Sequence, residues 1–412
     1  MTASTRLEQI FENTRTICFG RFLIEIPFTA TVVYGPAEVE LPIEYYAGQS
    51  KRLSEYLASR LTEVEQEREF LDKDATLRLP LFGKVIDGAL PGQKISFGSK
   101  DQSGYTIHSL IPIGKDLFIQ HIDSSLPKYD EVPVLNRIAT HLRPRSENEI
   151  PADAGMCIDG AFVPLEQDYE RVTIGIRLKE FPDVHISVDA HKNLKRLRTD
   201  NSPKLLREQA EEFAKADGLG AVFARTKILR QHERQLNIWD GEELALRTPA
   251  YKDDKSVHDF RFHSVGAIND RLHPELDIRL DSGLKGNDKA RVEPSLSDEE
   301  ALALWDKIIN TVRIRQPSDA TSLKPATPKV PLASTVRTGE TCPETGWWEC
   351  SASQRIEGSK RRLFKAGETM PLVLLKDPGL WQRLTGQHAV RQIATMWQLV
   401  QYNDETPLSI AG

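Results

Sequence analysis

The segment Ile17-Cys-Phe-Gly-Arg-Phe-Leu-Ile-Glu-Ile-Pro27 is rich in β-branched and aromatic residues and ends at a proline, which predicts strands. A second segment of similar order, Gly155-Met-Cys-Ile-Asp-Gly-Ala-Phe162, follows later in the chain. After each segment come further strands, a helix, more strands and a closing helix. This repeated order predicts two related units.

Helical periodicity marks the helices of both predicted units. In the first unit, apolar residues recur at helical spacing within 51–71, and a second helix ends before Arg143-Pro144. In the second unit, Ser202-Pro203 is typical of a helix start. Ser297-Asp-Glu-Glu300 is typical of a capping box.

The predicted fold class is α+β, with two related antiparallel-sheet-plus-two-helix domains and a small β-rich tail module. We expect both helices of each unit to lie on one face of its sheet. The alternative is a single larger mixed domain, which would require the strands of both halves to form one sheet.

Composition shifts give the predicted domain boundaries. The linker is rich in proline, and the tail holds four of the six tryptophans, for which core packing is a simpler explanation than a ligand platform. The predicted parts are an amino-terminal unit at 10–150, a carboxy-terminal unit at 151–316, a linker at 317–335 and a tryptophan-rich module at 336–404.

Composition excludes several classes of protein. The chain has 412 residues, of which 39% are hydrophobic and 28% charged, and this is ordinary globular composition. A net charge of −6 argues against binding nucleic acid through phosphate contacts. No apolar run approaches the roughly 20 residues of a membrane span, and we see no signal peptide at the start.

No strong catalytic, cofactor-binding or metal-binding motif is found in the sequence. We therefore predict no catalytic residues, no cofactor and no metal. Carboxylates are plentiful, so a hydrolase with dispersed carboxylates stays open as an alternative. An interaction module of the cell envelope is another.

The four cysteines leave two interpretations open. Cys342 and Cys350 bracket a short segment that could turn and close a disulfide, or they could be buried thiols in a reducing cell. Cys18 and Cys157 share a similar sequence context and form a second, weaker candidate pair.

An acidic stretch without lysine or arginine runs from Ser146 to Glu170, at the junction of the two predicted units. It is either a solvated linker face or one side of a cleft that attracts a basic partner. On the second interpretation, the candidate partner-binding residues are Asp159, Glu166, Asp168 and Glu170.

The two cysteine-containing segments, at this separation, resemble the two-domain immunity proteins of type VI secretion lipase effectors. The most similar group is that paired with the class-four phospholipase effectors. The resemblance covers roughly residues 10 to 316. The segment Thr341-Cys-Pro-Glu-Thr-Gly-Trp-Trp-Glu-Cys350 is similar to small modules appended to some relatives.

This resemblance implies a binding protein and not an enzyme. Such a protein would bind a cognate phospholipase effector in the periplasm and block the opening of its lid. An interface on the order of 1,600 Å² or more is within reach of two such domains. An oxidising periplasm would favour both candidate disulfides, Cys342–Cys350 more than Cys18–Cys157.

Overall fold

The computed structural model describes residues 3–72, 78–194, 202–286, 292–317, 330, 333–352, 356, 359–376 and 390–402. Contacts divide the chain into two compact units, Met1–Asp319 and Ala320–Gly412. Most of the predicted linker lies outside the described residues.

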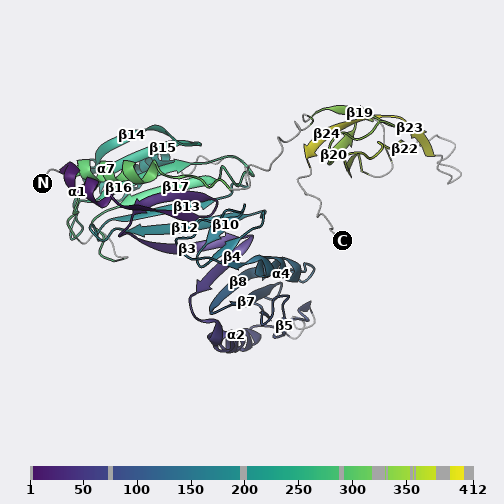
Figure 1. Ribbon diagram of the computed structural model, residues 1–412, viewed down its shortest axis with the longest axis horizontal. Helices are drawn as coiled ribbons and strands as arrows, with labels where there is room; N and C mark the ends of the chain where they lie inside the picture. Colours follow the sequence, from purple (N-terminus) through teal and green to yellow (C-terminus); the bar gives the residue numbers. More distant parts are fainter. Residues whose placement is uncertain are drawn as a thin grey trace. The chain divides into compact units, whose positions relative to one another are not determined.

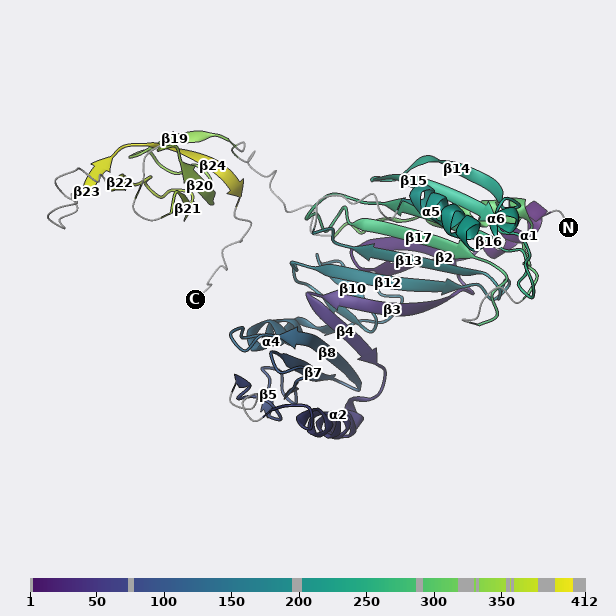
Figure 2. The ribbon, with the colours of Figure 1, turned by 180° about the vertical axis from the view of Figure 1, so that it is seen from behind.

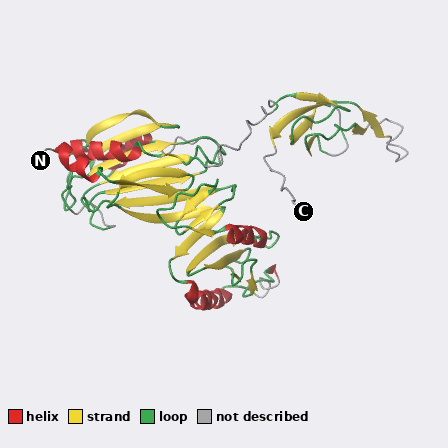
Figure 3. Ribbon diagram, viewed as in Figure 1, coloured by secondary structure: helices red, strands yellow, loops and turns green. Residues whose placement is uncertain are grey.

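One antiparallel sheet of twelve strands organises the described part of the larger unit (Figures 1 and 3). From its centre, the first half contributes β3 (Thr31–Val39), β4 (Leu41–Tyr46), β8 (Asp116–Ser125), β7 (Tyr105–Ile113), β6 (Lys94–Gly98) and β5 (Val85–Asp87). The second half contributes, in the same sense, β12 (Glu170–Arg177), β13 (His185–His191), β17 (Glu275–Asp281), β16 (His258–Ser264), β15 (Trp239–Arg247) and β14 (Lys227–Leu236).

The two halves have the same strand order and meet edge to edge. Strand β3 pairs antiparallel with β12, from Thr31 opposite Arg177 to Val39 opposite Glu170. The predicted α+β class with two related antiparallel units is confirmed. The strands of both halves nevertheless share one sheet, which is the arrangement that the single-domain alternative required. The domain bounds 10–150 and 151–316 therefore stay a prediction.

Two small sheets cross-connect the halves. Hairpin β1–β2 (Thr14–Phe19 and Phe22–Pro27) pairs with β18 (Arg313–Ile314), the last strand of the second half. Hairpin β10–β11 (Met156–Ile158 and Ala161–Val163) pairs with β9 (Arg143–Pro144), the last strand of the first half. The hairpin that begins each half thus pairs with the strand that ends the other half.

A disulfide joins the two hairpins. Cys18 is bonded to Cys157, and Gly20 and Cys157 exchange two backbone hydrogen bonds of 2.7 Å. The disulfide Cys18–Cys157, which the sequence patterns favoured less than Cys342–Cys350, is therefore present. The short Cys342–Cys350 bridge is not formed, and both of these cysteines are free and buried. Short spacing lowers the cost of closing a loop, but it does not make the two side chains point at each other.

The helices of the second half lie on opposite faces of the sheet. Helix α7 (Asp298–Ile309) appears in front of the sheet in Figure 1, and α5 (Pro203–Ala216) appears when the molecule is turned in Figure 2. Alternation along β15 explains this: Glu243 contacts Trp305 of α7, whereas Leu244 lines a hollow beneath α5. The expectation of two helices on one face is wrong.

The remaining helices of the larger unit are α1 (Ala3–Ile10), η1 (Ser50–Arg52), α2 (Leu53–Arg68), α4 (Val132–His141) and α6 (Gly220–Phe223). The predicted capping box of α7 is confirmed. Ser297 Oγ accepts from the Glu300 N–H at 3.2 Å, and Glu300 Oε2 accepts from the Ser297 N–H at 2.9 Å. This start positions Trp305, which is fully buried in the main core.

The carboxy-terminal unit is a small β module, as predicted. Its strands are β19 (Thr335–Arg337), β20 (Gly346–Cys350), β21 (Arg361–Phe364), β22 (Val373–Lys376), β23 (Val390–Ile393) and β24 (Met396–Tyr402). Trp348 and Trp397 are fully buried in its core, as the packing interpretation requires. Trp381, another tryptophan of the predicted module, lies outside the described residues.

Candidate partner-binding surface

Glu170, one of the four candidate partner-binding residues, is not on the surface. It begins β12, where it is 6% exposed, and its carboxylate is held by the buried guanidinium of Arg21. Arg21 Nε lies 2.7 Å from Oε2 and Nη2 lies 2.5 Å from Oε1. This bidentate pair links the first hairpin to the second half, so Glu170 has no free carboxylate to offer to a partner.

Glu166 and Asp168 are exposed in the segment before β12, although Glu166 already forms an ion pair with Arg271. Asp159 lies at the turn between β10 and β11 and is partly buried. Burial raises the pKa of Asp159, and the nearby Arg145 partly opposes this shift. The four candidates thus occupy three different environments: Glu166 and Asp168 are exposed, Asp159 is partly buried and Glu170 is buried.

Two hollows meet at Asp159, at the junction of the two halves. One has a volume of about 710 Å³ and the other about 630 Å³, and both include Tyr34, Tyr45 and Asp159 in their walls. The first is also lined by Phe118 and His121. Volumes of this size are within the range of protein sites that receive a ligand or an inserted side chain.

Tyr34 and Arg145 hold the floor of this junction in place. The Tyr34 hydroxyl donates to the Cys18 carbonyl at 3.1 Å and accepts from Arg145 Nη2 at 3.0 Å. Burial raises the pKa of Tyr34, so the phenol stays neutral and keeps donating. Arg145 also donates to the Ile158 carbonyl at 3.0 Å, which fixes the strand before Asp159.

Gly160 allows the close approach of the turn to Tyr45. Its φ is +65°, and a Cβ there would come within 2.3 Å of the Tyr45 ring. A larger residue would both strain the backbone and displace the ring. These contacts hold the aromatic side chains of the junction in fixed positions. Sequence patterns did not predict that Tyr34 and Tyr45 lie at this surface, and the adjacent tyrosines in Glu44-Tyr-Tyr46 are the sequence feature that could have indicated it.

Tyr46 lies beside this surface. It donates a hydrogen bond of 2.5 Å to Glu44, and this bond, together with burial, raises the pKa of Tyr46 to about 12.

Within the described residues, no group of three or more His, Cys, Asp or Glu side chains is placed to hold a metal ion. None of the described helices is long and apolar enough to span a bilayer.

Comparison with known proteins gives one family match. Residues 149–317 match the model of the Tle cognate immunity protein 4 C-terminal domain. This region of the chain is thus similar to that family. The predicted resemblance to effector immunity proteins, which are not enzymes, is thereby confirmed. A search of curated proteins gave no match.

Solved structures share the fold. The immunity protein TplEi of the type VI secretion system of Pseudomonas aeruginosa, in complex with an "L" peptide, is 24% identical with a TM-score of 0.54. That alignment covers 73% of this chain and 98% of TplEi. A structure of the Tle4–Tli4 complex contains a chain that is 21% identical with a TM-score of 0.57, covering 74% of this chain and 98% of the other. Apo TplEi is 22% identical with a TM-score of 0.54, covering 74% and 99%.

Proposed function

We propose that this protein neutralises a cognate phospholipase effector of type VI secretion by binding it and blocking the opening of its lid. The observation that carries the proposal is the match of residues 149–317 to the C-terminal domain of an effector-cognate immunity protein. A structural neighbour of the same fold was solved within a Tle4–Tli4 complex, which supports a protein partner for this chain.

The proposed contact surface is the junction between the halves. Asp159 lies between two hollows there, and the exposed carboxylates of Glu166 and Asp168 come from the segment that leads into the central strand β12. Acidic side chains at the rim of an interface mainly accelerate association with a basic partner and impose a dependence on salt. Apolar and aromatic side chains in the hollows would contribute most of the affinity.

We propose the periplasm as the site of action. The disulfide Cys18–Cys157 supports this location, because such bonds form and persist in oxidising compartments. Fractionation of cells that express the natural gene, with immunodetection of the protein, would test it. Recovery only with cytoplasmic markers would contradict the proposal.

The central experiment measures phospholipid hydrolysis by the purified cognate effector while this protein is added. Activity should fall to background at a stoichiometric amount of the protein. Full turnover at saturating protein would overturn the proposed function.

Charge reversal tests the contact surface. Asp159→Lys combined with Asp168→Lys should slow association with the effector about tenfold at low salt, because two attractive charges become repulsive. Glu69→Lys, a single charge reversal at an exposed carboxylate at the end of α2, is the control. Glu170 is left intact because its reversal would break a buried ion pair. Equal rates for both variants would remove the acidic residues from the contact.

A fluorophore on the lid of the effector tests the lid mechanism. Its emission should change when micelles are added to the free effector and stay constant in the complex. A lid signal that still responds while hydrolysis is abolished would show inhibition by another route.

A further inference from the structure

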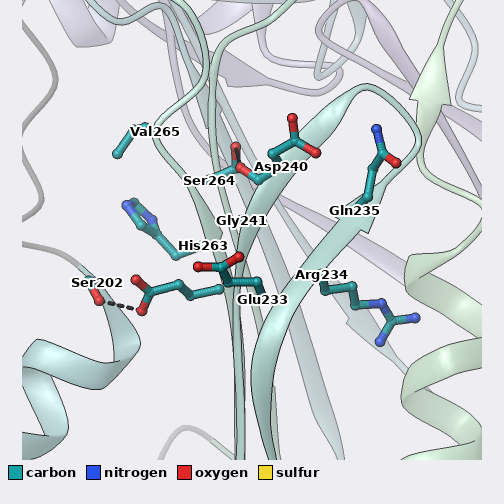
Figure 4. A pocket seen from close by; sticks show the side chains of 10 residues that line it. Ser202, Glu233, Arg234, Gln235, Asp240, Gly241, His263, Ser264 and Val265 are labelled. Carbon is teal, nitrogen blue, oxygen red and sulfur yellow. Dashed lines mark hydrogen bonds between the residues drawn. The ribbon is translucent and has the colours of Figure 1, made fainter.

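Another hollow lies away from the two at the junction, on the face of the second half that carries α5. Its volume is about 500 Å³, and it opens beside Ser202, the residue before α5 (Figure 4). The lining residues are Ser202, Glu233, Arg234, Gln235, Asp240, Gly241, Glu242, His263, Ser264 and Val265.

Acidic side chains are placed opposite each other in this hollow by strand register. Glu233 of β14 is the cross-strand partner of Glu242 of β15, and Glu242 is the partner of His263 of β16. Cross-strand partners point to the same face, and like charges directly opposite each other destabilise a sheet. Asp240 lies two residues before Glu242 and therefore also points to this face.

Among the described residues, no arginine or lysine pairs with the carboxylate of Glu233 or Glu242. Arg234 is the one arginine or lysine among the ten described residues that line the hollow, and in Figure 4 it points away from Glu233. Its guanidinium donates to Glu243 at 2.6 Å and to Asp306 at 2.9 Å on the α7 side of the sheet. Glu242 accepts a hydrogen bond from Ser202. Among the described residues, the Glu233 carboxylate has no hydrogen-bond or ion-pair partner.

Two other carboxylates on the same face, Asp277 and Asp189, are compensated by arginines. Asp277 accepts from Arg261 Nε at 2.9 Å and from Arg279 Nε at 2.9 Å. Asp189 accepts from Arg171 Nε at 3.0 Å. These two carboxylates thus have arginine partners among the described residues, whereas Glu233 and Glu242 have none.

His263 adds an independent sign of a missing partner. It is 4% exposed, yet neither ring nitrogen has a hydrogen-bond partner within the described residues. The carboxylates of Asp277 and Glu275 lie 3.6 and 3.8 Å from its nitrogens, beyond ordinary hydrogen-bond distance. A buried polar ring at the wall of an open hollow leaves hydrogen-bonding capacity that a ligand can use.

We propose that this hollow binds a cationic side chain, a guanidinium or an ammonium, presented by the effector. Glu233 and Glu242 would accept its hydrogen bonds, and the backbone around Ser264 and Val265 would form the opposite wall. A cation placed between two facing carboxylates removes their repulsion and gains charge-assisted hydrogen bonds, so binding and relief of repulsion act in the same direction. The assignment of the cation to the effector rests on the proposed function. The binding of a cation in the hollow is argued from this chain alone and does not depend on that function.

A small probe tests the hollow without the effector. Argininamide, N-acetylated so that the guanidinium is its only charge, is titrated into the full chain at low salt, and the NMR signals of the His263 ring are followed. N-acetylated citrullinamide, which has a similar shape and no charge, is the control. Argininamide should shift these signals saturably, and citrullinamide should not. In Glu233→Gln/Glu242→Gln, which keeps the shape of both side chains, the shift should be lost.

Two further readouts complete the test. The double variant should melt at the same or a higher temperature than the parent, because the facing charges are gone, which shows that it folds. Its affinity for the effector should fall about tenfold, and the salt dependence of binding should weaken. Glu69→Gln, which removes one exposed carboxylate at the end of α2, should leave affinity unchanged.

The outcomes separate the two proposals. Equal argininamide shifts in parent and double variant, or no shift in the parent, overturn the hollow as a cation site. Argininamide binding with unchanged effector affinity in the double variant overturns its assignment to the effector. Failure of the parent protein to bind the effector at all overturns the proposed function, and the argininamide titration still decides the hollow.

Discussion

The two halves of the larger unit have the same strand order but treat corresponding faces of the sheet differently. In the first half, α2 covers an apolar cluster that includes Leu110, Leu117 and Ile119. In the second half, α5 lies over a hollow of about 420 Å³ whose floor carries Asp259, Arg261 and Arg279. The same topology therefore supports a closed face in one half and an open, charged face in the other.

The difference extends to the helices themselves. Helix α2 inserts Arg60, which is 6% exposed and bonded to Glu67 and Thr106, whereas α5 buries only Pro203 at its start. The backbone pairing of β3 with β12 joins the two halves. The side chains on the faces of the sheet can therefore differ between the halves while the fold is kept. The open face of the second half thus has polar groups, such as the Glu233 carboxylate, that are available to a partner.

Loss of the disulfide should have the largest effect on stability, because it joins the halves. The double variant Cys18→Ala/Cys157→Ala should lower the free energy of unfolding of the larger unit by about 5 kcal/mol on the chain-entropy estimate for its sequence separation of 139. Urea denaturation followed by tryptophan fluorescence measures it. Cys342→Ala/Cys350→Ala is the control and should leave this transition unchanged; an equal loss there would contradict the assigned pairing.

The closing helix of the second half should be the next most sensitive element. Trp305→Ala should cost about 4 kcal/mol, because a fully buried ring that packs on Phe260 is removed and Glu243 loses the indole N–H donor. Leu135→Ala in α4 makes the corresponding change in the first half and should cost about 3 kcal/mol. A Trp305→Ala cost below 1 kcal/mol in urea denaturation would show that α7 does not anchor the second half.

The buried ion pair between the halves should follow. Arg21→Met should cost about 3 kcal/mol, since it leaves the Glu170 carboxylate buried and unpaired. Arg21→Met/Glu170→Met should recover much of this loss in thermal or urea unfolding. Lys100→Met removes an exposed ion pair with Asp123 and should change stability by less than about 1 kcal/mol. Failure of the second methionine to recover stability would mean that the pair is not the cause.

The smallest effect concerns pH and the open face of the second half. Burial and the facing Asp259 raise the pKa of Asp281 to about 6 in the folded protein, from an ordinary value of 3.8. The folded state thus favours the protonated form, and stability from this group is lost as pH rises from about 4 to 6. Asp281→Asn should abolish that part of the pH dependence and stabilise the protein at pH 7 by about 1 kcal/mol, allowing for solvent screening.

Asp123 lies near the end of β8, the strand of the first half that corresponds to β17. Its carboxylate is exposed and lies 3.4 Å from Lys100. Asp123→Asn should therefore change stability at pH 7 by less than about 0.5 kcal/mol. Unfolding measured at pH 4, 5, 6 and 7 compares the two variants directly, and identical pH profiles for Asp281→Asn and the parent protein would refute the difference between the halves.

Local patterns predicted individual elements well because their causes lie within a few residues. The capping box at Ser297 forms as expected, since its two hydrogen bonds join residues three apart. The helical spacing in 51–71 corresponds to α2, and the second cysteine-containing segment forms β10 and β11. Repetition of this local order also indicated two related units.

The candidate surface was predicted less completely. Asp159 lies at the junction hollows, but Glu170 is turned inward by Arg21, a residue 149 positions earlier in the chain. No pattern near Glu170 carries that information. Tyr34, Tyr45 and the open hollow at Glu233 were missed for the same reason, because each depends on strands that are distant in sequence.

The sequence by itself determined that this chain has two related α+β halves and a separate β-rich tail, and that it resembles effector immunity proteins. Strand alternation, helix caps and the order of elements are local properties, so short stretches of the sequence are enough to predict them. Only the tertiary structure decided that β3 joins β12 in one sheet, that each hairpin completes the other half, and which cysteines pair. Those features depend on which distant surfaces exclude water together, and one alternating strand does not specify its neighbour.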